Sequence, residues 1–267
     1  MSARAFVGVP ADWLVEERSE VAGFVTREVY RLPDGTRRIW ESRRHRKTSH
    51  ERLGRWTAIL FMIGSFLFGL GVVPAYADAV GAAVDASTFF VGSIFFTSAG
   101  YLQFVQAINA PDAVGAAGDE GLRWFAWQPH RIDWWACGVQ SVGTLLFNVS
   151  TFAATLTALD PEQARHLVWA PDMVGSIAFM IASVLAWLEV VHGWFGFRPH
   201  DVGWWIAACN LGGSIAFQIS AIAAVIDPVN GQVANLRLAN LGTFVGAVGF
   251  FAGAWLLFPE MRRSDDG

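Results

Sequence analysis

Six long stretches of this chain carry no charged side chain, and this pattern restricts the fold more than any other. They are residues 56–76, 86–111, 134–159, 173–188, 202–226 and 238–259. Five exceed the roughly 20 residues that cross a hydrocarbon core about 30 Å thick, and Val190 and Val191 extend the fourth beyond Glu189. With 54% hydrophobic and 16% charged residues, the chain is too apolar for an ordinary soluble domain. This excludes a soluble multidomain enzyme, a secreted disulfide scaffold and a tethered nucleic-acid-binding domain.

The sequence therefore predicts an all-α integral membrane protein. The domains expected are a cytoplasmic N-terminal segment (1–50), a six-helix transmembrane domain (51–260) and a cytoplasmic tail (261–267). The transmembrane helices are expected near 56–76, 86–109, 134–159, 171–192, 202–226 and 238–259.

The basic residues predict the orientation. Lys and Arg near helix ends are retained on the cytoplasmic side. Twelve of the 19 basic residues precede residue 56, five more fall in alternate connections and the C-terminal tail, and only Arg165 and Arg237 fall on the other side. We therefore expect a multi-pass protein of the bacterial inner membrane with both termini in the cytoplasm. The N-terminus lacks the basic and apolar pattern of a cleaved signal peptide, so the first helix is expected to serve as its own anchor.

The N-terminal segment contains a hairpin pattern. Residues 24–31 and 36–43 are rich in β-branched and aromatic side chains, and they flank Leu32-Pro33-Asp34-Gly35. Asp-Gly supplies the positive φ angles of a tight turn, so a β-hairpin is expected near 24–43. Because an isolated hairpin is marginally stable in water, it should rest on the membrane domain, on residues 7–15 or on another subunit.

A basic cluster follows the hairpin, formed by Arg43, Arg44, Arg46 and Lys47. Contact with acidic lipid headgroups is one interpretation. We prefer the other, a topology anchor beside the first transmembrane helix.

An internal repeat is the most informative feature after the apolar stretches. Residues 124–150 align without gaps with residues 194–220, and the shared residues include Trp-Phe, Pro-His and Trp-Trp pairs. A shorter pattern, Gly followed by Phe four residues on and a small residue seven on, occurs in every predicted helix. Its glycines and phenylalanines are Gly64/Phe68, Gly92/Phe96, Gly143/Phe147, Gly175/Phe179, Gly213/Phe217 and Gly246/Phe250.

These patterns predict three tandem two-helix units that start near Glu51, His130 and His200. All three units have the same orientation, so a pseudo-threefold axis along the membrane normal can relate them. Spacings of four and seven place Gly, Phe and the small residue on one helix face. In lipid, small residues allow close helix packing, so we interpret the pattern as a seam in which each Phe fills the space beside a Gly.

The Gly-Ser-x-x-Phe segments in 63–71 and 91–100, and the C-terminal 245–260 ending Leu-Leu-Phe-Pro-Glu, resemble the YrhK-like bacterial membrane domain. Residues 88–98, 131–152 and 192–205 resemble uncharacterised multi-spanning membrane proteins of actinobacteria. Neither resemblance implies a known activity or functional residues.

Polar residues inside a membrane span are candidates for function. Gln140 and Asn148 on the third helix occupy the same repeat positions as Asn210 and Gln218 on the fifth. One interpretation is a polar patch near the pseudo-axis that coordinates a solute or ion. We prefer the alternative, in which the amides form hydrogen bonds between helices.

Two pairs of ionisable residues lie toward the cytoplasmic side. Glu189 and His192 share a face of the fourth helix and could relay protons or bind a metal, but the depth of Glu189 favours snorkelling to the interface or pairing with Arg198 or Arg131. His130 and His200 begin two repeats, where a capping role is more economical than a metal site. We therefore expect no metal.

No nucleophile motif, phosphate loop or haem-type His pair occurs, so we expect neither enzymatic activity nor a cofactor. The bilayer is the expected partner, together with another protein or a second copy, and nucleic acid is not expected. Two classes of function remain. The preferred one is a membrane-anchored interaction or sensory module. The alternative is a transporter or channel for a neutral or lipid-like solute along the pseudo-threefold axis.

Overall fold

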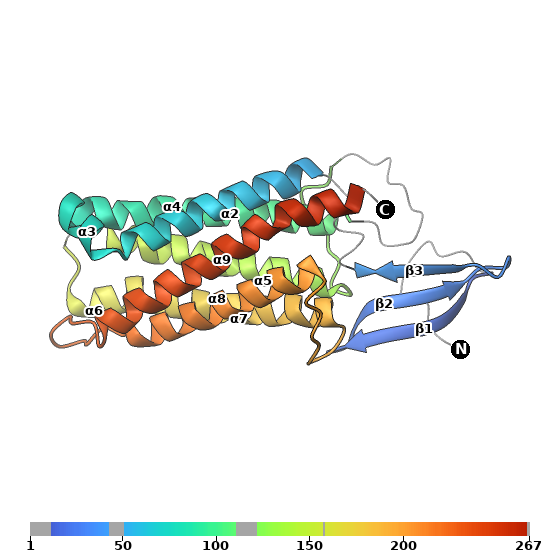
Figure 1. The fold of residues 1–267 in the computed structure, drawn as a ribbon. Coiled ribbons are helices and arrows are strands. Elements are labelled where there is room, and N and C mark those ends of the chain that lie inside the picture. The colour runs from blue at the N-terminus through green and yellow to red at the C-terminus, as the bar shows by residue number, and fades with distance from the viewer. Residues whose placement is uncertain (1–11, 43–50, 111–121, 157, 266–267) are drawn as a thin grey trace.

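Long helices form most of the computed structural model, which describes residues 12–42, 51–110, 122–156 and 158–265. Figure 1 shows these helices side by side in an elongated bundle, with a small sheet projecting from one end. We call this the sheet end and the opposite end the distal end. Helix α2 begins and helix α9 ends at the sheet end, and the short helices α3 and α6 lie at the distal end.

Within the described residues, five helical segments are long and apolar enough to cross a membrane, so the protein is a polytopic membrane protein. Helix α5 has 23 residues, about 35 Å at 1.5 Å per residue, but it is less apolar because Trp, amide and hydroxyl side chains occupy many positions. The helical elements are α2 (Glu51–Gly71), α3 (Pro74–Val80), α4 (Ala82–Ile108), α5 (Ile132–Ala154), α6 (Pro161–Ala164), the π-helical turn η1 (Arg165–Trp169), α7 (Ala170–Val191), α8 (Val202–Ala223) and α9 (Leu236–Asp265).

Several helix boundaries differ from the sequence prediction by five residues or more, and two of these differences have a clear local cause. The first helix ends at Gly71 instead of continuing to residue 76, because Val73 is extended and Pro74 begins the separate helix α3. The fourth predicted helix starts about ten residues earlier than expected. There, the Asp160 carboxylate and the Gln163 side chain form a capping box at the start of α6, which runs through η1 into α7.

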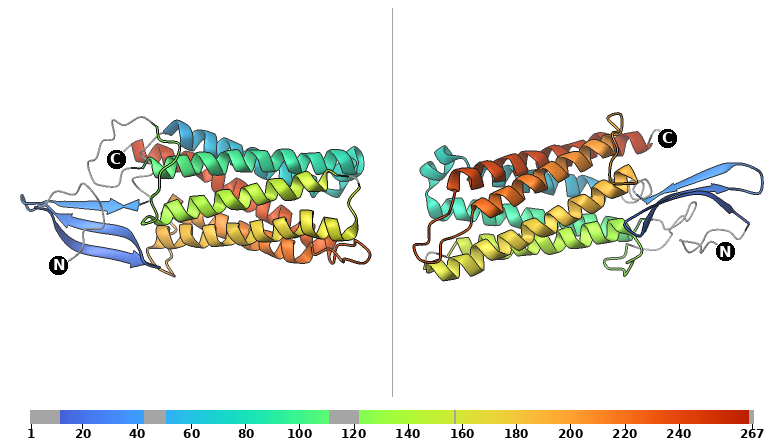
Figure 2. Two further views of the ribbon diagram at one scale, coloured as in Figure 1. Left: turned by 180° about the vertical axis from the view of Figure 1, so that it is seen from behind. Right: turned by 90° about the horizontal axis from the view of Figure 1, so that it is seen from below.

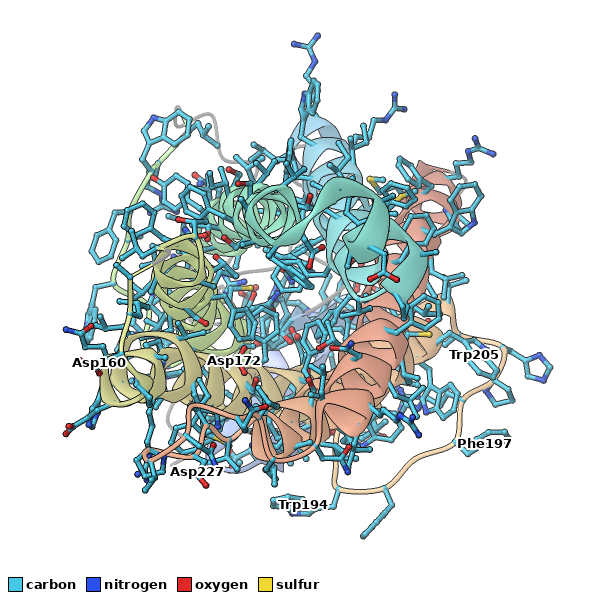
Figure 3. All side chains as sticks on the ribbon, turned by 90° about the vertical axis from the view of Figure 1, so that its left-hand side faces the viewer. Asp160, Asp172, Trp194, Phe197, Trp205 and Asp227 are labelled. Carbon is cyan, nitrogen blue, oxygen red and sulfur yellow. The ribbon has the colours of Figure 1, made fainter. Side chains whose placement is uncertain are left out.

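The long helices form a closed ring. Each packs on its neighbours in the chain, and α9 also packs on α2. The two views of Figure 2 agree with this order, and Figure 3 shows side chains filling the centre of the ring when the bundle is seen from the distal end. The centre of the ring is therefore the place to look for a site or a path.

The sheet has three antiparallel strands in the order β1 (Leu14–Val21), β2 (Phe24–Arg31) and β3 (Arg37–Glu41). The predicted hairpin corresponds to β2 and β3, and Gly35 has the positive φ that its turn needs. Strand β1 was not predicted from the sequence. It joins β2 through Ala22 and Gly23, which both have positive φ, as a type I′ turn requires.

Some polar side chains of the sheet are buried. The Tyr30 hydroxyl donates a hydrogen bond to Glu28, which is 1% exposed and forms an ion pair with Arg18 at 3.6 Å. Burial raises the pKa of Tyr30, and the hydrogen bond and charge of Glu28 raise it further. Tyr30 and Trp40 form a buried cluster against which Trp13 packs.

The sheet rests directly on the bundle. Val21, beside the β1–β2 turn, packs with Ile132 of α5 and Leu188 of α7 in one buried cluster, and Phe24 packs against them. The sheet therefore rests on the membrane domain, one of the supports considered for the hairpin. The basic cluster at Arg43, Arg44, Arg46 and Lys47 lies outside the described residues.

Candidate functional site: a closed bundle centre and a polar chamber

Glycine and phenylalanine interlock in three pairs of helices. A Cβ atom on Gly143 of α5 would lie 2.9 Å from the Phe179 ring and 3.0 Å from the carbonyl oxygen of Gly175 on α7. A Cβ atom on Gly175 would in turn lie 2.9 Å from the Phe147 ring. The same reciprocal contacts join α2 with α4 and α8 with α9. They involve Gly64/Phe96, Gly92/Phe68, Gly213/Phe250 and Gly246/Phe217.

The phenylalanines of this pattern meet at the centre of the ring, and we call them the axial Phe cluster. Phe68, Phe147 and Phe217 form one layer, with ring centroids 6.1–6.4 Å apart. The second layer has centroids 5.4–6.3 Å apart and consists of Phe96, Phe179 and Phe250. All belong to one buried core cluster, so they close the centre of the bundle to water and solutes.

A small chamber lies on the sheet-end side of the axial Phe cluster. Its volume is about 50 Å³, which gives room for about three to five waters at 10–15 Å³ each. Gln140 and Asn210 line it together with Phe61 of α2, and all three stand three residues before a glycine of the Gly–Phe pattern. Gln103 and Ser183 add polar groups, so amide and hydroxyl side chains from α4, α5, α7 and α8 converge here.

A second small cavity, of about 40 Å³, shares Gln103 with the chamber and lies between α2, α4 and α9. Gln106, Thr57 and Glu260 line it. Thr57 is 2% exposed, and its hydroxyl has no hydrogen-bond partner among the described residues. Polar side chains therefore continue from the chamber toward the sheet end.

The other two predicted amides lie on the opposite side of the axial Phe cluster and do not line the chamber. Asn148 Nδ2 donates a hydrogen bond of 2.9 Å to Thr97 Oγ1 on α4, and Gln218 Nε2 lies 3.1 Å from Met173 Sδ on α7. The side-chain carbonyl oxygens of both residues are buried and have no hydrogen-bond partner in the described structure. The predicted four-residue patch is thus divided by the axial Phe cluster.

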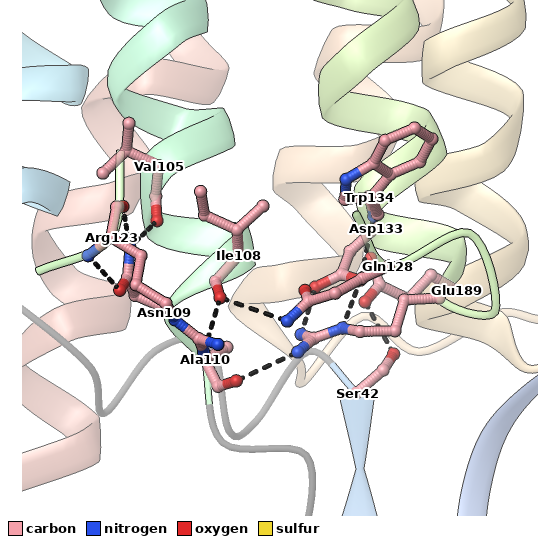
Figure 4. Close-up of polar contacts among 11 residues, drawn as sticks. Ser42, Val105, Ile108, Asn109, Ala110, Arg123, Gln128, Asp133, Trp134 and Glu189 are labelled. Atoms are coloured by element: carbon pink, nitrogen blue, oxygen red, sulfur yellow. Dashed lines mark hydrogen bonds and ion pairs between the residues drawn. The ribbon is translucent and has the colours of Figure 1, made fainter. Parts of the chain in front are cut away.

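At the sheet end, the carboxylate of Glu189 joins the sheet to the bundle. Glu189 is fully buried, and its Oε1 accepts a hydrogen bond of 2.6 Å from Ser42 Oγ, directly after β3. Figure 4 shows Ser42, Glu189 and Asp133 at this end of the bundle. Asp133 forms a buried ion pair with Arg131 at 2.7 Å, and Arg131 Nη1 donates to the carbonyl of Ala110 after α4. Buried charges require such partners.

His192 lies beyond Glu189, at the C-cap of α7, and adopts a left-handed conformation with φ of 53°. Its Nδ1 is buried and has no hydrogen-bond partner among the described residues. Burial lowers the pKa of His192 below 6.5, and the charges of Arg198 and Arg27 lower it further, while Glu41 raises it. The predicted pair therefore combines a carboxylate bonded to the sheet with a histidine that favours its neutral form.

The two repeat-initial histidines, His130 and His200, are exposed. At the start of α8, Asp201 Oδ1 accepts a hydrogen bond of 2.8 Å from the backbone N–H of Gly203, so the acidic residue provides the cap. Within the described ranges, no group of three or more His, Cys, Asp or Glu residues could hold a metal ion.

The repeated tryptophans hold the preceding connections in place. The Trp134 indole donates to the Ala126 carbonyl at 2.9 Å, and the Trp204 indole donates to the Gly196 carbonyl at 2.8 Å. The next tryptophan of each repeat bonds equivalent carbonyls, Trp135 to Pro129 and Trp205 to Pro199. The repeated spacing of the tryptophans thus gives the same hydrogen bonds at both connections.

Several functional candidates were missed from the sequence. Gln103 stands eleven residues after Gly92 on the same helix. Counting from this glycine of the Gly–Phe pattern could have placed Gln103 at the level of the chamber. No sequence pattern pointed to Ser42, because its hydrogen-bond partner Glu189 is 147 residues away in the chain. The Asp172 side chain on α7 has no hydrogen bond or ion pair within the described ranges. Figure 3 places it nearer the bundle centre than Asp160 and Asp227.

No protein-family model, curated protein or solved structure matches this chain. The geometry of the described residues is therefore the basis for the functional proposal.

Proposed function

We propose that this chain is a membrane-anchored interaction or sensory module. In this proposal a six-helix bundle of three two-helix units anchors the sheet at the cytoplasmic face of a bacterial inner membrane and presents it to a protein partner. We further propose that it acts without a catalytic reaction or a bound cofactor. The resemblance to the YrhK-like membrane domain remains part of this proposal.

Three relationships support the arrangement in units. The reciprocal Gly–Phe contacts join α2 with α4, α5 with α7 and α8 with α9. Phenylalanines from equivalent positions form the two layers of the axial cluster. Helix α5 lies between α4 and α7 in the ring and is long enough to cross the bilayer. Added to the five more apolar segments, it gives six crossings, which is an even number. Both termini then lie on one side, in agreement with the basic residues.

The attachment of the sheet to the bundle is the observation that carries the function. The sheet contacts the bundle through the Val21–Ile132–Leu188 cluster and through the Ser42–Glu189 hydrogen bond. Because Glu189 belongs to α7, a shift of α7 changes the position of the C-terminal end of β3. The strand itself exposes Arg37, Arg38 and Ile39. These contacts provide a direct route from the bundle to an accessible sheet surface.

Site-specific photocrosslinking in intact cells tests this proposal. A photoreactive amino acid at Ile39, which is 42% exposed, should capture a discrete protein. The same probe at Leu241 of α9, which is 58% exposed on the apolar bundle, is the control and should capture lipid or nothing. The Ile39 product should weaken in a Ser42→Ala/Glu189→Gln variant. Identical products from Ile39 and Leu241 would contradict the proposal.

The chamber supports a second candidate, the passage of a small neutral solute. Amides from α4, α5 and α8 converge at its wall, and the adjoining cavity leads toward the sheet end. In this conformation the two layers of the axial Phe cluster close the path between the chamber and the distal end. Passage of a solute therefore requires at least one phenylalanine of each layer to move. Solute flux into vesicles, with the chamber amides replaced, tests this candidate and is developed in the Discussion.

A further inference from the structure

A lateral groove runs between α2 and α9 on the outside of the bundle. It encloses about 330 Å³ and is lined almost entirely by apolar side chains, among them Leu70, Phe66 and Phe251. Phe66 is 60% exposed and Phe251 is 36% exposed, so the groove opens toward the surroundings of the bundle and not toward its centre. In a polytopic membrane protein that surface faces lipid chains.

The groove exists because small residues stand where the other units carry larger ones. Gly69 occupies the repeat position of Asn148 and Gln218, and a Cβ atom placed on it would lie 3.7 Å from the Cβ of Ala247 on α9. Neither residue fills the space between the two helices. The junction between the first and last helices of the ring is therefore hollow on its outer face.

A second cavity of about 330 Å³ continues the groove toward the distal end. The two cavities share Val73 and Phe244, and the second is also lined by Arg237 and Asn240 of α9. The combined groove is thus apolar along its length and has a cation and an amide at its distal end.

Among the described residues, the Arg237 side chain has no charge partner. It is exposed, and neither the Arg237 nor the Asn240 side chain has a hydrogen bond or ion pair in the described parts of the chain. The other basic residue at the distal end, Arg165, instead packs over the Trp169 ring at 5.7 Å. Arg237 therefore offers an unneutralised guanidinium beside the mouth of an apolar groove.

We propose that this groove binds one anionic phospholipid, with an acyl chain between α2 and α9 and its phosphate at Arg237 and Asn240. A flexible aliphatic chain fits a long apolar groove with small residues at its floor. A guanidinium fork suits phosphate oxygens, and an amide N–H supplies a further donor. With the orientation proposed above, the lipid belongs to the outer leaflet, but the site itself depends only on the protein lying in a bilayer.

Native mass spectrometry of the purified full-length protein tests the site. Delipidated protein is mixed with phosphatidylglycerol or with phosphatidylcholine of the same chains. Wild type should retain one phosphatidylglycerol molecule in preference to phosphatidylcholine. Arg237→Gln should reduce that preference about fivefold, the factor that one basic group contributes near anionic lipid. Arg165→Gln is the matched control and should leave the preference unchanged.

A second variant tests the acyl chain separately from the phosphate. Gly69→Leu should reduce retention of both lipids, because its side chain occupies the groove. Gly212→Leu adds the same bulk to α8 at a place with no neighbour within 4 Å, and it should bind like wild type. Millimolar inorganic phosphate should not displace the lipid. Equal binding of both lipids by wild type, loss of preference in Arg165→Gln, or displacement by phosphate alone would overturn the proposal.

Discussion

Ser42 Oγ donates a hydrogen bond of 2.6 Å to the buried carboxylate of Glu189, and this bond joins the end of the sheet to α7. The carboxylate is fully buried, so its interactions with neighbouring groups replace those with water. The bond therefore makes the position of the sheet depend on the position of α7.

Breaking this bond should loosen the sheet without unfolding the bundle. Ser42→Ala removes the donor and leaves Glu189 Oε1 without it, at an expected cost of about 1–3 kcal/mol in sheet docking. Amide hydrogen exchange should become faster in β2 and β3 and stay unchanged in α8. Ser98→Ala is the control, because the Ser98 hydroxyl bonds only the Ile94 carbonyl of its own helix. Unchanged exchange in β3 would show that the bond does not hold the sheet.

The interlocked glycines provide a test of packing. Gly143→Leu and Gly213→Leu should each lower bundle stability by about 1–3 kcal/mol, because even a Cβ atom at these sites meets neighbouring atoms at 2.9–3.1 Å. Thermal unfolding in detergent measures the loss. Gly212→Leu, beside Gly213 but with open space around it, should unfold like wild type. Equal unfolding temperatures for Gly213→Leu and Gly212→Leu would count against a packing role for the seam.

The membrane helices and the Gly–Phe seam could be predicted because both depend on periodic local patterns. A charge-free apolar stretch of about 20 residues matches the thickness of the bilayer core, and spacings of four and seven fix one helix face. The sequence spacing could also have shown that the four predicted amides do not form one patch. Gln140 and Asn148 are eight residues apart, a rise of about 12 Å along the helix, so one small site could not include both.

The remaining features depend on contacts that no local pattern contains. Strand β1 has many charged side chains but few β-forming residues, and its pairing with β2 is supported by the ion pairs of Glu16 with Arg31 and of Glu17 with Arg27. The α2–α9 groove depends on which helices close the ring. The Ser42–Glu189 bond joins residues far apart in the chain.

Topology can be measured by cysteine labelling in a variant without Cys137 and Cys209. Val229 lies in the connection at the distal end and is 87% exposed, and Phe195 lies in the connection at the sheet end and is 96% exposed. If both termini are cytoplasmic, a membrane-impermeant thiol reagent should label Val229→Cys in intact cells and Phe195→Cys only after lysis. The reverse pattern would place the sheet outside the cell.

Acidification should destabilise the protein through His192. Burial lowers the pKa of His192 in the folded state below 6.5, so the unfolded chain takes up the proton first as the pH falls. The stability is therefore full above pH 6.5 and declines below it. His192→Asn tolerates the left-handed backbone and removes the titration, so its unfolding temperature should change less between pH 7.5 and pH 5.5. Parallel profiles for both proteins would exclude His192 as the cause.

The chamber amides give the most direct test of solute passage. Gln140→Leu/Asn210→Leu replaces two polar groups of the chamber wall, whereas Asn148→Leu/Gln218→Leu replaces amides that contact neighbouring helices on the other side of the axial Phe cluster. If the chamber conducts, vesicles with wild-type protein should take up a small neutral solute such as glycerol or urea faster than empty vesicles. Only the first double variant should remove this uptake.

The second double variant should cost about 1 kcal/mol of stability, since an interhelical hydrogen bond in a membrane averages about 0.6 kcal/mol, and it should leave uptake unchanged. The paired design separates a conducting chamber from a merely structural one, because both variants place two leucines in the bundle. Wild-type uptake equal to that of empty vesicles for every solute tried would end the transport candidate. The chamber would then be a packing defect filled by water, and the membrane-anchored interaction module would be the one remaining proposal for the function.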